Sequence, residues 1–386
     1  MDLSKFLEGY PGKLVKVATP DPDWAFVPNP LPRNWALPTE LYPKLITARE
    51  KLARLDGAGR FMPASSILLR PLQQREAITS SRLEGTFVTA EELLAYGLEP
   101  KNPVSTSDPK NAWREVFNYD EALQKGQKTL KDFPLSNGVI KELHNVLLSG
   151  VRGANRTPGQ FRTRQVHIGA DRRFVPSPPE RVEGLMHGIE EYMNETEDSL
   201  DPLVRSFMAH YQFETTHPFL VGNGRVGRLL LSLMVYKTCG LQQPWLYLSA
   251  HFEKNKNEYI DALFNVSAQG NWGAWVNVCL NASIAEAQNA MERIDKLLEL
   301  KKTYEAKIHA HKGSNVRLMK ILTSLLASPM VTVPRLQKQF DVTFPTAQAD
   351  MDKLIALGIL KKSARINKPQ YYIAAEIFAA AYSEIP

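Results

Sequence analysis

The chain has 386 residues, of which 44% are hydrophobic and 23% charged, and 47 Lys and Arg against 41 Asp and Glu give a formal charge of +6. These shares exclude wholesale disorder and favour two or three globular domains, at about 150 residues per domain. No window approaches the ~18 consecutive apolar residues of a membrane span, and the first residues lack the apolar run of a secretory signal, so we expect a cytoplasmic protein with no membrane partner.

Residues 1–37 are expected to form an extended arm, because they hold six prolines and show no period of 2 or 3.6. Residues 38–105 read as a helical module. Its first helix is predicted to start after Pro38 and to stop at Gly57 and Gly59. A second helix is predicted at about 72–83, with Gly85 in the position that often follows a helix C-terminus. Thr89 and Glu92 stand in capping-box spacing for a third helix.

Residues 106–310 are expected to form a second and larger helical unit. The spacing of apolar residues predicts helices at 112–125, 138–149, 180–195, 202–211 and about 257–307. Between them, residues 165–169 and 173–176 read as a short hairpin, which is the strand signal ahead of the C-terminal region. The fold class is therefore predicted to be mainly α with one hairpin.

Residues 314–386 carry nine basic and five acidic side chains, so much of the excess positive charge lies there. Helices are predicted at 315–327 and 334–340 and from Pro345, followed by two strands around a basic loop from Arg365 to Lys368. This order is typical of a winged helix-turn-helix with 344–353 as the recognition helix, which makes DNA a possible partner. Asp350 and Asp352 on that helix would repel phosphates, so protein docking or a homodimer is the alternative.

The most informative segment is 217–228, which reads His-Pro-Phe-Leu-Val-Gly-Asn-Gly-Arg-Val-Gly-Arg. The proline after His217 disfavours helix there, and the two glycines around Asn223 can bring bare backbone close to a ligand. A buried helix resumes from Arg225, so its unpaired N–H groups form an anion site beside Arg225 and Arg228. A histidine at such a site, with a pKa near 6.5, is partly neutral at pH 7 and is placed to act as a general base.

Two other interpretations of this segment fit less well. Gly222, Gly224 and Gly227 match a dinucleotide fingerprint, but a helix precedes them and no acid follows at the required distance. His210, Glu214 and His217 could face one way on a helix as metal ligands, but no further ligand is evident and Cys239 and Cys279 offer no zinc spacing. No bound metal is expected, and Glu214 is predicted to be an internal hydrogen-bonding residue.

The segment resembles the signature of the Fic (filamentation induced by cAMP) family, His-Pro-Phe-x-acid-Gly-Asn-Gly-Arg-x-x-Arg. The resemblance implies a Fic-type helical core and transfer of AMP from ATP to a Ser, Thr or Tyr hydroxyl of a target protein. By position, His217 would deprotonate the hydroxyl and Phe219 would anchor the loop. The residues implied to bind ATP are Gly222, Asn223, Gly224, Arg225, Val226, Gly227 and Arg228, with Arg228 reaching the γ-phosphate.

One position departs from the family signature. Val221 stands where the family usually has an acid that helps to hold Mg²⁺, and an aliphatic side chain cannot ligate a metal. Either ATP, Asn223 and water hold the ion without a carboxylate, or affinity and rate are reduced. Gly224, where the kinase-like branch has lysine, resembles the AMP-transferring members.

Ser80 to Gly85 resembles the inhibitory motif of the family, Ser/Thr-x-x-x-Glu-Gly/Asn. Ser80 and Glu84 lie one turn apart on a helix face, so Glu84 is expected to pair bidentately with Arg228 and to exclude the γ-phosphate. The resemblance also implies that Val166, Ile168 and Val175 belong to a flap that aligns a target segment through its exposed edge. Tyr259 falls where the family often contacts adenine, although a helix residue of this kind is also common in the core.

We therefore expect a protein adenylyltransferase that uses ATP, acts on a protein target and on itself, and is inhibited by its own N-terminal helix. The alternatives are a DNA-binding regulator whose Fic domain senses nucleotide, and an enzyme that removes AMP with Glu84 positioning water.

Overall fold

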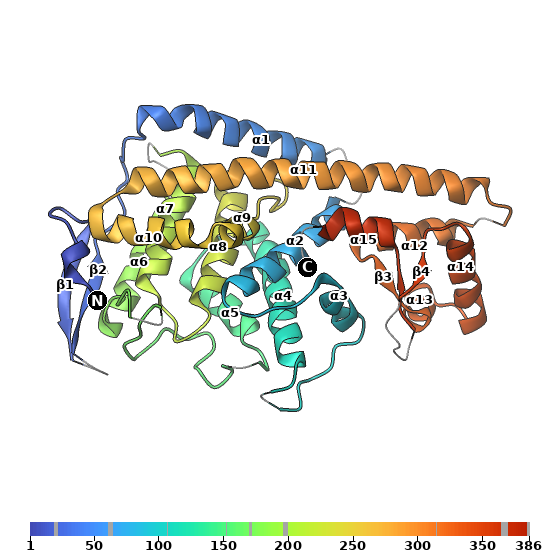
Figure 1. Ribbon diagram of the computed structural model, residues 1–386, viewed down its shortest axis with the longest axis horizontal. Coiled ribbons are helices and arrows are strands. Elements are labelled where there is room, and N and C mark those ends of the chain that lie inside the picture. Colours follow the sequence, from blue (N-terminus) through green and yellow to red (C-terminus); the bar gives the residue numbers. More distant parts are fainter. Residues whose placement is uncertain are drawn as a thin grey trace.

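Helices dominate the computed structural model, which describes residues 1–18, 22–60, 65–105, 107–151, 153–169, 172–195, 200–313, 315–363 and 370–383. The predicted mainly α fold class is confirmed (Figure 1). No helix in these ranges is long and apolar enough to cross a membrane.

The longest helix, α11 (Trp272–Ala310), runs along the body and reaches the C-terminal region, and α1 (Tyr42–Arg60) lies beside it (Figure 1). The predicted stop of the first helix at Gly57 and Gly59 is wrong, because α1 continues through both glycines. Gly59 has a packing role instead. A Cβ at this position would overlap the indole of Trp245, so the bare backbone lets the end of α1 approach the ring.

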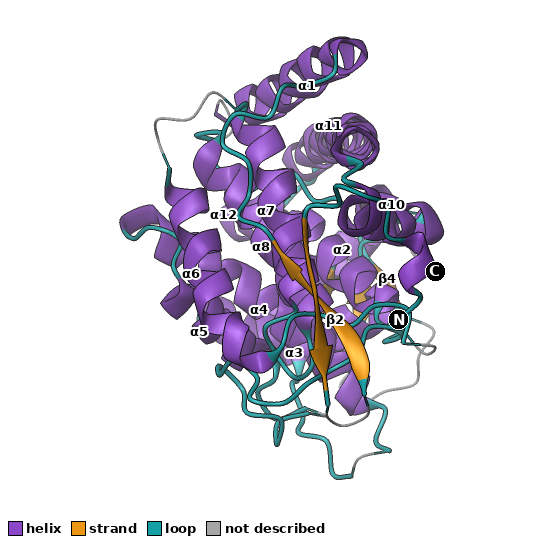
Figure 2. Ribbon diagram, turned by 90° about the vertical axis from the view of Figure 1, so that its left-hand side faces the viewer, coloured by secondary structure: helices purple, strands orange, loops and turns teal. Residues whose placement is uncertain are grey.

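The N-terminal segment forms a hairpin, where the sequence predicted an extended arm. After the short 3₁₀ helix η1 (Leu3–Lys5), β1 (Gly12–Val17) pairs antiparallel with β2 (Asp23–Pro28), and the ribbon lies across one end of the helical body (Figure 2). Phe26 is fully buried against Phe174 and Phe264. Because Ala25 and Phe26 are buried in succession, β2 lacks the alternation that marks a half-buried strand. A second 3₁₀ turn, η2 (Thr39–Leu41), leads into α1.

Two more helices lie between α1 and the central bundle. The first, α2 (Ser65–Leu83), starts earlier than predicted and contains Pro71, and α3 (Ala90–Leu98) has the predicted capping box between Thr89 and Glu92. The bundle itself consists of α4 (Lys110–Asp132), α5 (Asn137–Leu147), α6 (Pro179–Asn194), α7 (Pro202–Thr216), α8 (Asn223–Thr238), α9 (Ser249–Lys254), α10 (Lys256–Gln269) and the first part of α11.

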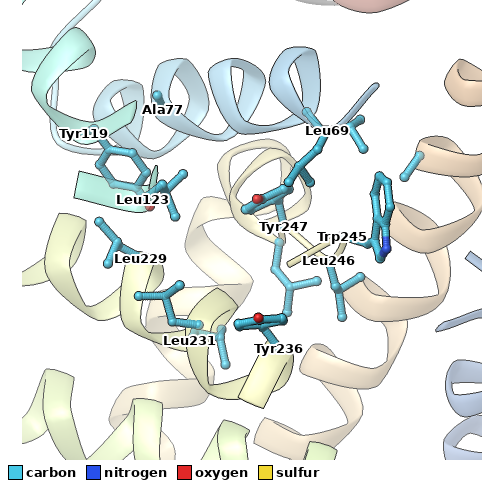
Figure 3. Close-up of a cluster of buried hydrophobic side chains, with 14 of the residues drawn as sticks. Leu69, Ala77, Tyr119, Leu123, Leu229, Leu231, Tyr236, Trp245, Leu246 and Tyr247 are labelled. Carbon is cyan, nitrogen blue, oxygen red and sulfur yellow. The ribbon is translucent and has the colours of Figure 1, made fainter. Parts of the chain in front are cut away.

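Helix α8 is the centre of the core, because nearly every residue from Asn223 to Tyr236 is buried. Figure 3 shows Leu229, Leu231 and Tyr236 of α8 near Tyr119 and Leu123 of α4. Leu69 and Ala77 of α2 and the segment Trp245–Tyr247 complete the labelled cluster. The helix that carries Glu84 at its end is thus part of the same core as the helix that carries Arg228.

The predicted hairpin at 165–176 is present as a single isolated bridge between Ile168 and Phe174. Its second segment is covered by the N-terminal ribbon, since the Phe26 N–H donates to the Val175 carbonyl at 2.9 Å. That contact makes β2 the neighbour of this segment, a pairing between residues about 150 positions apart that local sequence patterns do not reveal.

The C-terminal region contains the predicted helices and strands. Helices α12 (Val316–Ala327), α13 (Val333–Phe340) and α14 (Phe344–Ala356) accompany a sheet of order β3 (Met330–Val331), β5 (Tyr372–Ile373), β4 (Lys361–Lys362), and α15 (Ala375–Tyr382) follows. This order fits the predicted winged helix-turn-helix, although the basic residues Arg365 and Lys368 lie outside the described residues. Asp350 is buried and ion-paired with Arg317, so it does not face outward from α14 as the sequence suggested.

Candidate active site

The loop between α7 and α8 depends on two left-handed backbone positions. His217 ends α7 with φ +50° and ψ +62°, and Gly222 precedes α8 with φ +81°. Such a conformation costs a non-glycine residue roughly 1–2 kcal/mol, so the surroundings must hold His217 in place. Arg162 does this from the side, because its Nε donates to the His217 carbonyl and its backbone N–H to the Pro218 carbonyl, both at 2.8 Å.

The interior of the loop is fixed by one amide and one imidazole. The Asn223 side chain accepts from the Phe219 N–H and donates to the Phe219 carbonyl, both at 2.8 Å. The ring of His144 stacks on the fully buried ring of Phe219 with centroids 3.8 Å apart, and its Nε2 bonds the Val221 carbonyl at 3.0 Å. The loop is therefore a rigid frame that presents the N-terminus of α8.

The imidazole of His217 is held in one tautomer. Its Nδ1 lies 3.3 Å from the Glu214 carbonyl, and since a carbonyl accepts, Nδ1 carries the hydrogen and Nε2 keeps its lone pair. Burial lowers the pKa of His217 to about 4, which corrects the expectation of a value near 6.5. A solvent-like value was expected because a sequence does not show desolvation. The ring is therefore neutral at physiological pH.

Arg228 is the hub of the charged contacts. Its Nη2 donates to Glu84 Oε1 at 2.7 Å and to the Ser80 carbonyl at 2.9 Å, and its Nε donates to Ser80 Oγ at 2.9 Å. The predicted bidentate pair is thus wrong in detail, because Ser80 takes the bonds that a second carboxylate oxygen would have taken. Burial raises the pKa of Glu84, but the Arg228 charge and hydrogen bond outweigh it, so the pKa lies below its usual range.

The end of α2 is also held by contacts outside the predicted motif. Lys256 Nζ donates to the Leu83 carbonyl at 2.7 Å, and Arg82 lies 3.6 Å from the Glu253 carboxylate. Gly85 follows the helix with φ +84°. The carboxylate of Glu84 is consequently presented from a helix end that is tied to α9 and α10.

A cavity of about 400 Å³ opens between these elements. Its polar part includes Glu84, Glu214, His217, Gly224, Arg228 and Lys256, and its apolar part includes Ile168, Phe174, Tyr259, Ile260, Leu263 and Phe264. A Cβ on Gly224 would overlap Glu84 Oε1, so the Glu84 carboxylate lies directly on the first turn of α8. The cavity combines a cation, a helix N-terminus and an apolar wall, which suits a nucleotide.

Tyr259 lines this cavity but is 5% exposed, and its hydroxyl lies 3.0 Å from His210 Nε2. His210 Nδ1 bonds the Gly227 carbonyl at 3.0 Å, so both ring nitrogens are occupied and burial lowers the pKa of His210 to about 3. Neither ring nitrogen of His210 is therefore free to bind zinc, which argues further against the metal interpretation. Contact between Tyr259 and adenine stays a prediction.

Arg225 is not among the residues that line the cavity. Its Nη1 lies 3.6 Å from Glu115 Oε2, and its Nε and Nη1 have no hydrogen-bond partner within the described chain. Val226 is buried, and Gly227 packs on Glu214. Of the side chains predicted to bind ATP, Arg228 and Tyr259 line the cavity, whereas Asn223, Arg225 and Val226 do not.

The three flap residues do not share one surface. Ile168 lines the cavity, Val166 lines a separate hollow beside β1, and Val175 is fully buried. The predicted use of an exposed edge at Val175 is wrong, because β2 occupies that edge through Phe26.

The side chains of the loop do not fit Mg²⁺. Val221 is aliphatic and its carbonyl is bonded by His144, and both ends of the Asn223 amide are used by Phe219. Magnesium prefers carboxylate, phosphate and water oxygens. The described residues contain no group of three His, Cys, Asp or Glu suited to a metal ion. We therefore assign no protein-bound Mg²⁺ to this loop.

Four residues of the site were not predicted from the sequence: His144, Arg162, Glu214 as a cavity residue, and Lys256. All four lie outside the signature, and the fold brings His144, Arg162 and Lys256 to it from distant parts of the chain. Glu214 carried a signal, since it lies one helical turn before His217 and had to share its face.

Comparison with known proteins gives the context of this geometry. Residues 42–128 match the Fic/DOC family N-terminal domain, and residues 134–235 match the Fic/DOC family. The chain belongs to the Fic/DOC family. The first match ends within α4 and the second ends within α8, so together they include α1, α2 and the loop.

Curated relatives of this Fic/DOC protein carry the name protein adenylyltransferase. Protein adenylyltransferase fic-1 of Caenorhabditis elegans is 37% identical over 128 residues, which is 32% of this chain and 24% of the worm protein. A probable protein adenylyltransferase of Aquifex aeolicus is 30% identical over 192 residues, covering 50% of this chain and 54% of its own length. The chain therefore spans about a quarter of the curated animal relatives it matches and about half of the bacterial one.

Solved structures agree in fold. A Fic family protein from Desulfovibrio desulfuricans G20 covers 88% of this chain and 98% of its own, with a TM-score of 0.54 at 19% identity. Fic-1 from C. elegans covers 67% of this chain and 75% of the crystallised one, with a TM-score of 0.54 at 23% identity.

Proposed function

We propose that this protein transfers AMP from ATP to a Ser, Thr or Tyr hydroxyl of a target protein and that Glu84 holds it inhibited. The observation that carries the proposal is the shared cavity of His217 and Arg228 at the N-terminus of α8. The names of the curated relatives support the same reaction class.

The geometry gives each group a task. The N–H groups of Asn223, Gly224 and Arg225 begin α8 and lack intrahelical partners, so they are available to phosphate oxygens. The target hydroxyl attacks the α-phosphorus, its proton passes to His217 Nε2, the bond to the β-phosphate oxygen breaks, and pyrophosphate leaves. Arg228 and the helix N-terminus would stabilise the charge that develops on the phosphates.

Inhibition follows from competition for one guanidinium. Glu84 contacts Arg228 at 2.7 Å and lies against Gly224, so a carboxylate occupies the position that a phosphate needs. ATP can then bind productively after this contact breaks. The tie between Lys256 and Leu83 supports the inhibited position of the helix end.

Labelled nucleotide tests this proposal. The Glu84→Gly variant should acquire label from ATP carrying ³²P at the α-phosphate and none from ATP carrying it at the γ-phosphate, either on itself or on a protein in an added lysate. Adding His217→Ala to that variant should abolish the labelling. Transfer of the γ-phosphate would identify a kinase, and labelling that persists without His217 would remove the base from the mechanism.

DNA binding by residues 315–383 is a separate proposal. The burial of Asp350 removes one of the two acids expected to repel phosphates, whereas Asp352 stays exposed on α14. A gel-shift titration with random duplex DNA at two salt concentrations tests it, since phosphate contacts weaken steeply with salt.

A further inference from the structure

Glu214 packs against α8 at the position of Gly227. It lies in the last turn of α7, one turn before His217, and lines the same cavity as Arg228 and Tyr259. A Cβ at position 227 would overlap Glu214 Oε1, so this carboxyl group packs directly on the backbone of α8. The glycine in the Arg-Val-Gly-Arg part of the loop sequence therefore accommodates Glu214.

The carboxyl group of Glu214 has no hydrogen-bond donor. Its Oε1 is buried without a partner, and none of the described residues donates to either oxygen. The fold treats another buried acid differently: Glu76 accepts from the Tyr119 hydroxyl at 2.9 Å and from the Ser249 hydroxyl and N–H at 2.5 and 3.2 Å. A buried carboxyl without such partners is costly, so its presence needs an explanation.

The charged groups near Glu214 do not explain why its carboxyl group is buried without a hydrogen-bond donor. Burial raises the pKa of Glu214 to about 7, and the charge of Arg228 opposes this without a direct bond between the two. Arg228 instead directs its bonds to Ser80 and Glu84. The carboxyl is thus open to a donor that arrives from the cavity.

The chemistry of the ligand then limits the donor. The phosphates of ATP carry only acceptor oxygens and would be repelled by the ionised carboxylate, whereas the nucleoside carries donors at the ribose hydroxyls and at the adenine amino group. The cavity wall formed by Ile168, Phe174 and Phe264 suits an apolar ring. Resting on the proposed function, we propose that Glu214 accepts a hydrogen bond from the nucleoside part of the bound nucleotide and so determines which nucleotide the site takes.

Binding measurements with analogues test this proposal. The Glu84→Gly variant is titrated calorimetrically with ATP, 2′-deoxy-ATP, 3′-deoxy-ATP and inosine triphosphate, which lacks the amino donor. At least one analogue should bind about tenfold more weakly than ATP, as expected for a lost bond to a charged acceptor. A loss with either deoxy analogue assigns the donor to ribose, and a loss with inosine triphosphate assigns it to adenine.

The same titrations with Glu214→Met and Glu214→Ala in the Glu84→Gly background should show weaker ATP binding and a preference reduced to within about twofold, because neither side chain carries an oxygen acceptor. Glu258→Met on α10, an exposed residue outside the cavity lining, is the matched control and should keep the full preference. Glu214→Met keeps about the length of the side chain, so it tests the idea even where Glu214→Ala unfolds. Unchanged discrimination in the Met variant would overturn the inference.

These experiments distinguish failure of the proposed function from failure of the role proposed for Glu214. A Glu84→Gly protein that binds ATP with Glu214-dependent preference but transfers no AMP would refute the proposed function and leave the role of Glu214 intact. A protein that transfers AMP but shows the same nucleotide preference with and without Glu214 would support the proposed function and refute the role of Glu214. Absence of nucleotide binding would refute both.

Discussion

In the proposed mechanism, Arg228 takes part in both nucleotide binding and inhibition. A buried guanidinium needs a negative partner, and a helix N-terminus next to it needs one as well. Glu84 satisfies both in the structure, through the 2.7 Å contact and its position on Gly224. The proposed exchange of this carboxylate for a phosphate therefore keeps the charge of the site balanced.

The first prediction concerns that exchange. Glu84→Gly should raise the rate of AMP transfer at least about tenfold, because it vacates the position beside Arg228 without filling it. Glu84→Gln should give a smaller rise, since the amide can still accept from Arg228 but adds no charge. Initial rates of label incorporation measure both. Equal rates in the parent and in Glu84→Gly would contradict the inhibitory role.

The second prediction concerns pH. A general base must be neutral, and a histidine whose pKa burial lowers to about 4 stays neutral as the pH falls through 6.5. In the Glu84→Gly variant, kcat/KM should therefore show no decline from His217 between about pH 7 and 5. Removal of Glu84 strengthens this expectation, because that carboxylate raises the pKa of His217.

Glu214, whose pKa burial raises to about 7, titrates within that range, so the profile is repeated with Glu214→Gln. A limb that disappears in this variant belongs to Glu214. A decline centred near 6.5 in both variants would place His217 in solvent-like surroundings and refute the prediction.

The loop residues proposed to bind nucleotide were predictable because their chemistry is local. A proline, two glycines and two arginines within one short segment already specify a helix break and an anion site. The partners that hold the loop were not predictable. His144 and Arg162 contact it through backbone carbonyls, a contact that leaves no trace in the pattern of the loop itself.

Helices were predicted well where caps and apolar stripes coincide. The helix that starts at Pro202 has Asp201 as its cap, and α3 has its capping box. The failures have tertiary causes. The β1–β2 ribbon forms because Phe26 is buried against residues of the flap and of α10, and α1 passes Gly59 because Trp245 packs there. A sequence window contains neither partner.

The third prediction follows from the backbone of one helix. Gly184 lies exposed inside α6, a Cβ added there would meet no heavy atom within 4 Å, and its φ is not in the left-handed region. Gly184→Ala should stabilise the protein by about 0.5–1 kcal/mol, since alanine loses less backbone entropy on folding.

The matched control is Gly240→Ala, where the space is equally open but φ is +63°. That variant should destabilise by roughly 1 kcal/mol, because a side chain strains the left-handed position. Thermal midpoints measured in parallel should shift in opposite directions. Shifts of the same sign would show that backbone conformation does not determine how these two substitutions change stability.

At the scale of the whole molecule, the C-terminal region packs against α2, the helix that ends next to Glu84. Helices α12 and α15 pack on α2, and α15 lies beside it in Figure 1. The hydroxyl of Tyr382 on α15 donates to Gln74 Oε1 on α2. Arg293 of α11 holds the end of α15 through the carbonyls of Ala380 and Ser383, at 3.2 and 3.0 Å. These contacts connect α2 directly to the C-terminal region.

The fourth prediction tests this connection. Tyr382→Phe removes the bond to Gln74 while keeping the ring, and a buried hydrogen bond of about 1 kcal/mol corresponds to a shift of roughly fivefold in an equilibrium. Basal AMP transfer should rise by a few fold, less than in Glu84→Gly, because Glu84 still reaches Arg228. In the Glu84→Gly background the same substitution should add nothing, since no inhibited state is left to destabilise.

Tyr236→Phe, in α8, is the control, because its hydroxyl bonds neither α2 nor α15 in the described structure and its loss should leave the basal rate unchanged. If Tyr382→Phe raised the rate equally with and without Glu84, the effect would lie in the catalytic step and not in the inhibition. A rise confined to the protein with Glu84 would instead mean that the C-terminal region and the loop act on one shared element, the helix from Ser65 to Leu83.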